Sequence, residues 1–167
     1  LGTPTAPPNQ VLIGLAMLLT FFVMAPVLGR IDSEALQPYT RGEIDQTSAF
    51  DRAAAPLREF MFKETRPKDL ELFLSLGHLE RPATLDDIPN TVLLPAFVIS
   101  ELRTAFTMGF VLYIPFLIIE LVVSSVLLSM GMMQLPPMMI SLPFKVLLFV
   151  MIDGWKLTVC SLVRRLL

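Results

Sequence analysis

The sequence is poor in the residues on which most catalytic and metal sites depend. It has one cysteine, one histidine and one tryptophan in 167 residues. A single cysteine excludes a disulfide within the chain, and one histidine with one cysteine provides no metal-ligand spacing. The apolar part of the chain contains no Ser-His or Cys-His pair for nucleophilic catalysis. We therefore expect no enzyme, no cofactor and no metal site, with Cys160 a small buried hydrophobe and His78 solvated or capping.

Charge is also scarce. Charged residues make up 17% of the chain and hydrophobic residues 54%, with a mean hydropathy of +0.67, whereas soluble domains are about a quarter charged. The net charge of −2 gives no indication of nucleic-acid binding. The composition is that of a membrane-class protein.

The charges that are present divide the chain into three blocks. Residues 1–29 carry none, residues 30–91 carry 20 of the 28 charged groups, and residues 92–167 carry the other 8. We expect a loop and an apolar helix in the first block, a polar helical segment in the second and apolar helical hairpins in the third. The predicted fold class is all-α.

Periodicity and turn residues predict the elements of the first two blocks. Val11 to Gly29 is long enough to span a bilayer core, and residues 31–42 are predicted to form a loop. Two short helices, Ser48 to Thr65 and Lys68 to Leu79, should pack as a hairpin. Thr84 to Asp87 is predicted to form a capping box.

The third block is predicted to contain three helices, over residues 91–106, 109–130 and 141–167. Gly131 and the pair Pro136-Pro137 should interrupt the helix between the last two. We therefore expect a loop or sharp hairpin bend over residues 130–137.

This apolar block carries isolated charges at Glu101, Arg103, Glu120, Lys145 and Asp153. A charge in hydrocarbon costs several kcal/mol, so such residues usually face protein or water. They could snorkel at membrane interfaces, form buried ion pairs that set helix register, or relay protons or ions. We expect a pair of Glu101 with Lys145, within or between subunits, and a structural role for Glu120 as a hydrogen-bonded acid. Asp153 can pair locally with Lys156.

Methionines cluster in the loop over residues 130–137, at Met130, Met132 and Met133. Methionine in an apolar chain usually fills irregular packing. Flexible, polarizable side chains on one loop could also form an adaptable seal.

Several runs resemble the P subunit of the flagellar type III export gate, and the resemblance covers the whole chain. They are residues 95–106 (PAFVISELRTAF), 140–145 (ISLPFK), 153–155 (DGW), 1–12 (LGTPTAPPNQVL) and 53–61 (AAAPLREFM). Subunits of this family usually begin with a signal peptide and one more apolar helix, which would precede Leu1 here.

The resemblance implies a structural channel subunit. Copies of it, as a homo-oligomer and most simply a pentamer, assemble with the Q and R gate subunits into a helical ring or cone, with the B switch subunit a further candidate partner. The cone passes unfolded flagellar proteins from the cytoplasm across the bacterial inner membrane, and it sits partly in the periplasmic core of the basal body.

The resemblance also implies roles for particular residues. Met132 and Met133 match the methionine gasket that narrows the pore, beside Met130, and Gln134 stands where a third methionine is usual. Glu101 and Lys145 match charged positions that contact each other. The polar block matches the family's periplasmic segment, where Phe60, Arg66 and Phe73 are expected to contact neighbouring subunits.

Two other functions remain open from the sequence. A conventional multipass transporter could use Glu120 or Asp153 as a proton-coupled site. An intramembrane aspartyl protease would need two membrane aspartates, and the apolar block has only Asp153.

Overall fold

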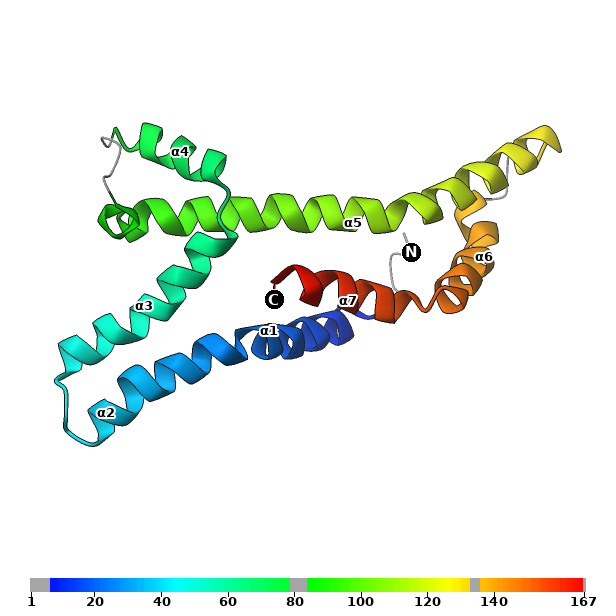
Figure 1. The fold of residues 1–167 in the computed structure, drawn as a ribbon. Helices are drawn as coiled ribbons and strands as arrows, with labels where there is room; N and C mark the ends of the chain where they lie inside the picture. Colours follow the sequence, from blue (N-terminus) through cyan, green and yellow to red (C-terminus); the bar gives the residue numbers. More distant parts are fainter. Residues whose placement is uncertain (1–6, 79–83, 133–135, 167) are drawn as a thin grey trace. The chain divides into compact units, whose positions relative to one another are not determined.

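Helices make up most of the described part of the chain. A computed structural model describes all residues except 1–6, 79–83, 133–135 and 167, and no strand occurs among the residues it describes. The expected all-α class is therefore confirmed (Figure 1). Two helical stretches, Asn9–Thr40 and Asn90–Ser129, are long and apolar enough to cross a membrane.

The first stretch continues beyond the predicted span. Helix α1 (Asn9–Ile31) leads through a π-helical turn, η1 (Asp32–Leu36), into the short helix α2 (Gln37–Thr40). The loop predicted over residues 31–42 is wrong. Pro38 lies in the first turn of α2, where a missing N–H costs nothing. The helix ends only before Gly42, whose φ of +74° suits glycine.

The two predicted helices of the polar block are present. Helix α3 (Gln46–Glu64) begins at Asp45, whose carboxylate accepts a hydrogen bond from the backbone N–H of Ser48 at 3.3 Å. Hydrogen bonding from Ser48 lowers the pKa of Asp45, because it stabilises the ionised form. Helix α4 (Pro67–Leu76) ends at Gly77, as the sequence indicated.

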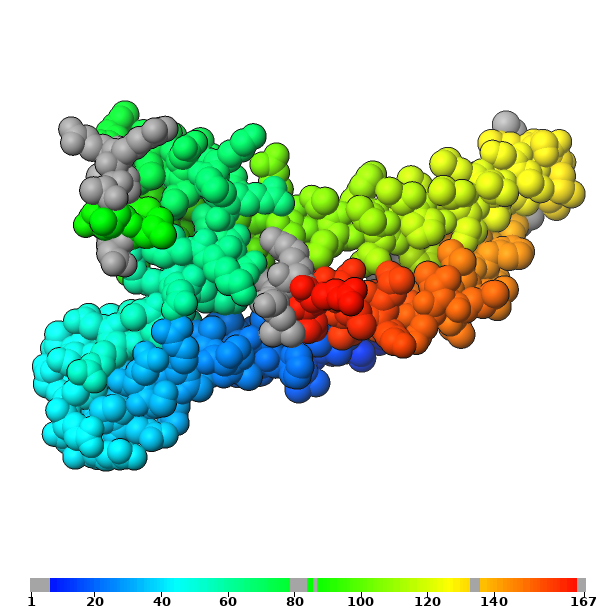
Figure 2. Space-filling model, in the orientation of Figure 1, coloured from blue at the N-terminus to red at the C-terminus, as the bar shows by residue number. Residues whose placement is uncertain are grey.

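These helices pack against the beginning of the long helix α5 (Asn90–Ser129). Buried Ile88, Val92 and Leu93 form a core with apolar side chains of α3 and α4, and Figure 2 shows the side chains of these segments gathered together. Arg58 of α3 stabilises this junction. Its guanidinium donates one hydrogen bond to the side chain of Asn90 and another, of 2.9 Å, to the carbonyl of Ile88.

The capping box predicted before α5 is confirmed. Thr84 donates from its backbone N–H and its hydroxyl to Oδ2 of Asp87, at 3.0 and 2.7 Å. The box starts a 3-10 turn, η2 (Leu85–Asp87), that leads into α5.

Helix α5 is one element, where the sequence predicted two. Gly109 lies inside it and does not break it. A glycine inside a helix costs only about 1 kcal/mol relative to alanine, which a long helix tolerates. Prolines such as Pro115 are tolerated in long apolar helices when neighbouring groups satisfy the freed carbonyl.

The last predicted helix is divided in two. Helix α6 (Pro137–Met151) and helix α7 (Gly154–Leu166) meet at an angle of 61°. At the break, Asp153 has a φ of +51°, which is unusual for a residue other than glycine. We call the break at Ile152 and Asp153 the elbow.

Contacts divide the chain into two units, Thr20–Phe106 and a second that joins Leu1–Leu19 to Thr107–Leu167. The junction of α3, α4 and α5 belongs to the first unit, and the hairpin of α5 and α6 with the elbow belongs to the second. The division of the sequence at residues 29 and 91 stays a prediction.

Candidate functional site

The end of α5 is fixed by the backbone at Gly131. Its φ is +74°, its N–H donates to the carbonyl of Leu128, and the N–H of Met132 donates to the carbonyl of Leu127, both at 3.0 Å. This pair of bonds around a left-handed glycine is the Schellman motif, which ends a helix and satisfies its last carbonyls. The predicted stop at Gly131 is confirmed.

The methionines at this end lie outside the packed interior. Met130 is 66% exposed and Met132 is 42% exposed. Met133 and Gln134, the other two residues expected in the gasket, lie outside the described residues. Helix α6 resumes at Pro137, which is in the first turn with Pro136 before it. The loop thus joins two helices, as predicted.

A buried ion pair holds the two arms of this hairpin together. Lys145 of α6 donates from Nζ to Oε2 of Glu120 of α5 at 2.6 Å, and the side chains are 1% and 25% exposed. Glu120 thus accepts a hydrogen bond in this structure, and its role as a structural acid stays a prediction. Lys145 in particular requires this partner, because without Glu120 its ammonium group would be buried and unpaired.

This pair corrects the expected partner of Lys145 within the chain. The sequence reasoning chose Glu101, whereas the structure pairs Lys145 with Glu120. In a helical hairpin, residues that are a similar number of positions from the connecting loop lie opposite each other. Glu120 and Lys145 are at similar numbers of positions from residues 130–137. A contact of Glu101 with Lys145 between copies of the chain stays a prediction.

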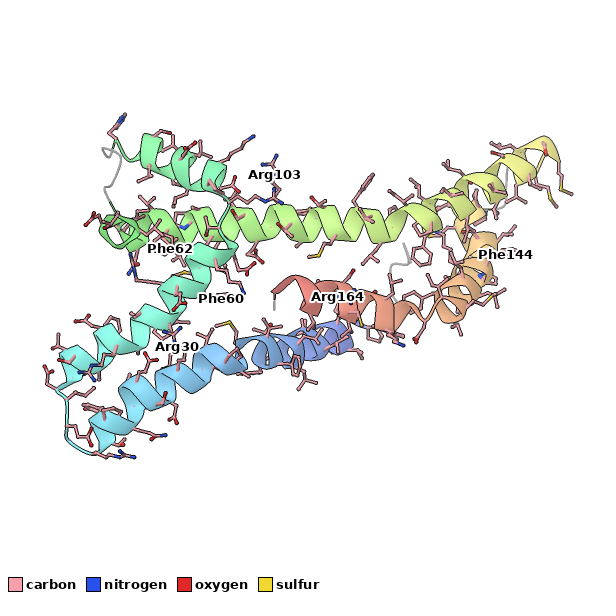
Figure 3. All side chains as sticks on the ribbon, in the orientation of Figure 1. Arg30, Phe60, Phe62, Arg103, Phe144 and Arg164 are labelled. Carbon is pink, nitrogen blue, oxygen red and sulfur yellow. The ribbon has the colours of Figure 1, made fainter. Side chains whose placement is uncertain are left out.

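The hairpin also has a wholly apolar hollow of about 640 Å³ between its arms. Only aliphatic, methionine and phenylalanine side chains line it, and Phe144 of α6 is among them (Figure 3). The lining residues are Ile118, Ile119, Val122, Val123, Val126, Leu127, Ile140, Phe144, Leu147, Leu148 and Met151.

An aromatic cluster supports the elbow. The ring of Phe149 lies 6.3 Å from that of Phe116 in α5 and 5.5 Å, edge to face, from that of Trp155 in α7. A Cβ at Gly154 would overlap the Phe149 ring. The sequence Asp153-Gly154-Trp155 is therefore a structural unit: a left-handed residue, a position without room for a side chain, and an aromatic contact.

A second polar cluster lies in the unit Thr20–Phe106, where α4 meets α5. Buried Ser100 of α5 accepts a hydrogen bond from the backbone N–H of Arg66 at 2.9 Å and donates to Oδ2 of buried Asp69 at 2.7 Å. The Arg66 guanidinium donates to Thr104 at 3.1 Å. This network fixes the beginning of α4 on α5.

The residues expected at subunit contacts make contacts within the chain. The ring of Phe60 lies edge to face with that of Phe97 at 6.0 Å, Arg66 belongs to the network above, and Phe73 packs on the core at Ile88. Figure 3 shows Phe60 at the end of α3 next to α5. Their role between subunits stays a prediction.

The other charges of the apolar block are less enclosed. Glu101 is half-buried, and Arg103 is exposed on the α4 side of α5 (Figure 3). Asp153 is exposed at the elbow, and none of the ion pairs found among the described residues joins it to Lys156. The break of the helix at the elbow removes the helical spacing on which that predicted pair depended.

The scarce reactive residues Cys160 and His78 belong to different units of the chain. Cys160 is exposed on α7, so the prediction that it is buried is wrong; it lies on the polar side of an amphipathic helix. His78 is exposed after α4, as expected. Among the described residues, no group of three His, Cys, Asp or Glu side chains could hold a metal ion.

Sequence reasoning missed three features that had a readable signal. The Glu120–Lys145 pair follows from the near-equal distances of both residues from the loop. The Arg66–Asp69–Ser100 network is indicated by Ser100 and Thr104, one helical turn apart in an apolar helix. The elbow is indicated by Asp153 and Gly154 interrupting an otherwise helical run.

Comparison with known proteins gives consistent matches along the chain. The model of the FliP family matches residues 1–162. The flagellar biosynthetic protein FliP of Bacillus subtilis (strain 168) is 57% identical over 164 residues, which are 98% of this chain and 74% of that protein. The FliP proteins of Pectobacterium carotovorum and Aquifex aeolicus are 56% and 52% identical, each over 98% of this chain and over 64% and 70% of their own lengths.

Proposed function

Since this chain belongs to the FliP family of flagellar biosynthetic proteins, we propose that it is a structural channel subunit of the flagellar type III protein export gate. In this role it passes unfolded flagellar proteins across the bacterial inner membrane and makes or breaks no covalent bond. The observation that carries the proposal is the α5–α6 hairpin, which holds exposed methionines at its tip on a rigid, ion-paired base.

The architecture of the hairpin suits a seal. The Schellman motif at Gly131 ends α5 at a defined residue, and the Glu120–Lys145 pair joins α5 to α6. Methionine side chains adapt their shape at low cost. A ring of such loops can therefore close on itself and part for a chain that is pushed through.

We further propose that the subunit works as a homo-oligomer, a pentamer by resemblance, together with the Q and R gate subunits and, as a further candidate, the B switch subunit. Its membrane-class helices support a location in the inner membrane, extending into the periplasmic core of the basal body. The large apolar surface that the helices leave exposed supports assembly with other chains.

The alternative of a proton-coupled transporter gains nothing from the geometry. Its first candidate site, Glu120, is engaged by Lys145. Its second, Asp153, is exposed at the elbow, and none of the ion pairs found among the described residues involves it.

The gasket assignment is tested by the double substitution Met132→Ala/Met133→Ala. Shortening both side chains should open the constriction, so cells that express the gate should leak ions more readily, as measured by dye-reported membrane permeability. Met17→Ala is the matched control, because Met17 is an exposed methionine in α1 and should leave permeability unchanged. Equal permeability in the double variant and the wild type would sink the gasket assignment.

A further inference from the structure

Helix α7 differs from the other helices of its unit in being amphipathic. Its sequence carries Lys156, Arg164 and Arg165 and no acidic residue. Val159, Leu162 and Val163 are half-buried along one side, whereas Lys156, Cys160 and Arg164 are exposed on the other. Figure 3 shows Arg164 on this helix. A helix with one apolar and one basic side is suited to the boundary between hydrocarbon and water.

The position of α7 in the chain agrees with such a boundary. It follows the apolar helix α6 at a bend of 61°, which lets α6 remain in the hydrocarbon while α7 turns out of it. Trp155, at the start of α7, is 46% exposed. Tryptophan, lysine and arginine are the residues enriched where helices leave the hydrocarbon.

The exposed side of α7 borders a hollow of about 680 Å³. Lys156 and Arg164 line it together with Asp153, Cys160 and Ser161 and with the apolar side chains of Ile152 and Leu157. The ion pairs found within the described ranges involve neither cation. Two cations and one carboxylate give the hollow a net positive charge. Its hydroxyl group and its two cations can donate hydrogen bonds to a phosphate.

We propose that this hollow binds the phosphate of anionic phospholipids at the membrane surface, with Lys156 and Arg164 as its charged ligands. The site lies on α7, apart from the methionine loop, and it does not depend on the proposed channel function. It gives the end of the chain a preference for one class of lipid headgroup and holds α7 against the membrane.

The test compares phosphatidylglycerol with phosphatidylcholine on the purified full chain in a non-ionic detergent, with dissociation constants measured by native mass spectrometry. The wild-type chain should bind the anionic lipid more tightly than the zwitterionic one. In the double variant Lys156→Gln/Arg164→Gln this affinity should fall about 25-fold, because each basic group near an anionic lipid contributes about a factor of five.

Arg52→Gln/Lys63→Gln is the matched control, since it removes two exposed cations from α3 and should keep the wild-type preference. Circular dichroism should show the same helix content in all variants. Equal affinity of the wild type for both lipids, or an unchanged preference in the Lys156/Arg164 variant, would overturn the proposal.

Two further outcomes identify another ligand and would also overturn it. If inorganic phosphate binds as tightly as phosphatidylglycerol and displaces it, the site takes a free anion rather than a lipid. If the Lys156/Arg164 variant changes the number of copies in the particle and leaves lipid preference unmoved, the surface is covered by a second chain.

Discussion

At the scale of single residues, Lys145 is the most constrained side chain of the hairpin. It is among the largest fully buried side chains of the described residues, and it forms an ion pair with Glu120. A buried ion pair does not by itself add much stability, because desolvation offsets the attraction. Its effect is to require one register of α5 against α6, and this register sets where the methionine loop lies.

Replacing Lys145 by methionine should therefore destabilise the chain by about 3 kcal/mol, at the lower end of the range for broken buried pairs because Glu120 is partly exposed. Glu120→Leu/Lys145→Met should recover most of that loss, since it leaves no unpaired charge. The free energy of unfolding in detergent measures both effects. Lys63→Met, on the exposed face of α3, is the control and should change it by less than about 0.5 kcal/mol.

The outcome that contradicts this interpretation is additivity. If the double variant is as unstable as the sum of Lys145→Met and Glu120→Leu, the two side chains do not act as a pair.

The residue scale is also where sequence reasoning reached its limit. Lys145, Glu101 and Glu120 were all recognisable as charges that need partners, because each stands in an apolar run. Which acid meets Lys145 depends on how far each helix continues before it turns, since Glu101 and Glu120 lie about five turns apart on α5. The close approach of Gly154 to Phe149 was not predicted either, because α6 and α7 were predicted to be one helix.

At the scale of elements, the chemistry of helix ends was more readable than the continuity of helices. Gly77, Gly131 and the capping box of Thr84 and Asp87 were placed correctly, because each acts through local backbone hydrogen bonds. By contrast, the sequence did not predict that α5 continues through Gly109 or that residues 32–40 are helical. Both depend on whether neighbouring structure outweighs a weak local preference.

The elbow between α6 and α7 provides a test at this scale. Gly154→Ala places a Cβ against the Phe149 ring, which is itself held by Phe116 and Trp155. We expect a loss of about 1 to 3 kcal/mol in the free energy of unfolding, the usual range for overpacking.

Gly109→Ala is the matched control, because no atom lies within 4 Å of a Cβ at that position. It should stabilise α5 by up to about 1 kcal/mol through helix propensity. If Gly154→Ala lowers the free energy of unfolding no more than Gly109→Ala does, the aromatic cluster does not set the bend.

At the scale of the whole molecule, the helices leave large apolar side chains exposed. Phe106 and Phe110 of α5, for example, are 77% and 63% exposed. Such a surface requires lipid or other chains around it.

The two proposals provide both kinds of surroundings. In the proposed assembly, other chains cover the apolar faces of α1 and α5, and lipid headgroups meet α7. Within the chain, the Glu120–Lys145 pair joins two apolar helices.

The mass and composition of the complex purified through a tag on this chain test the central proposal most directly. Native mass spectrometry of that complex in detergent should give several copies of the chain, five by resemblance, together with two other small membrane proteins. A monomer or dimer without other proteins, obtained from cells that assemble flagella, would contradict the proposal that this chain is a subunit of an export channel.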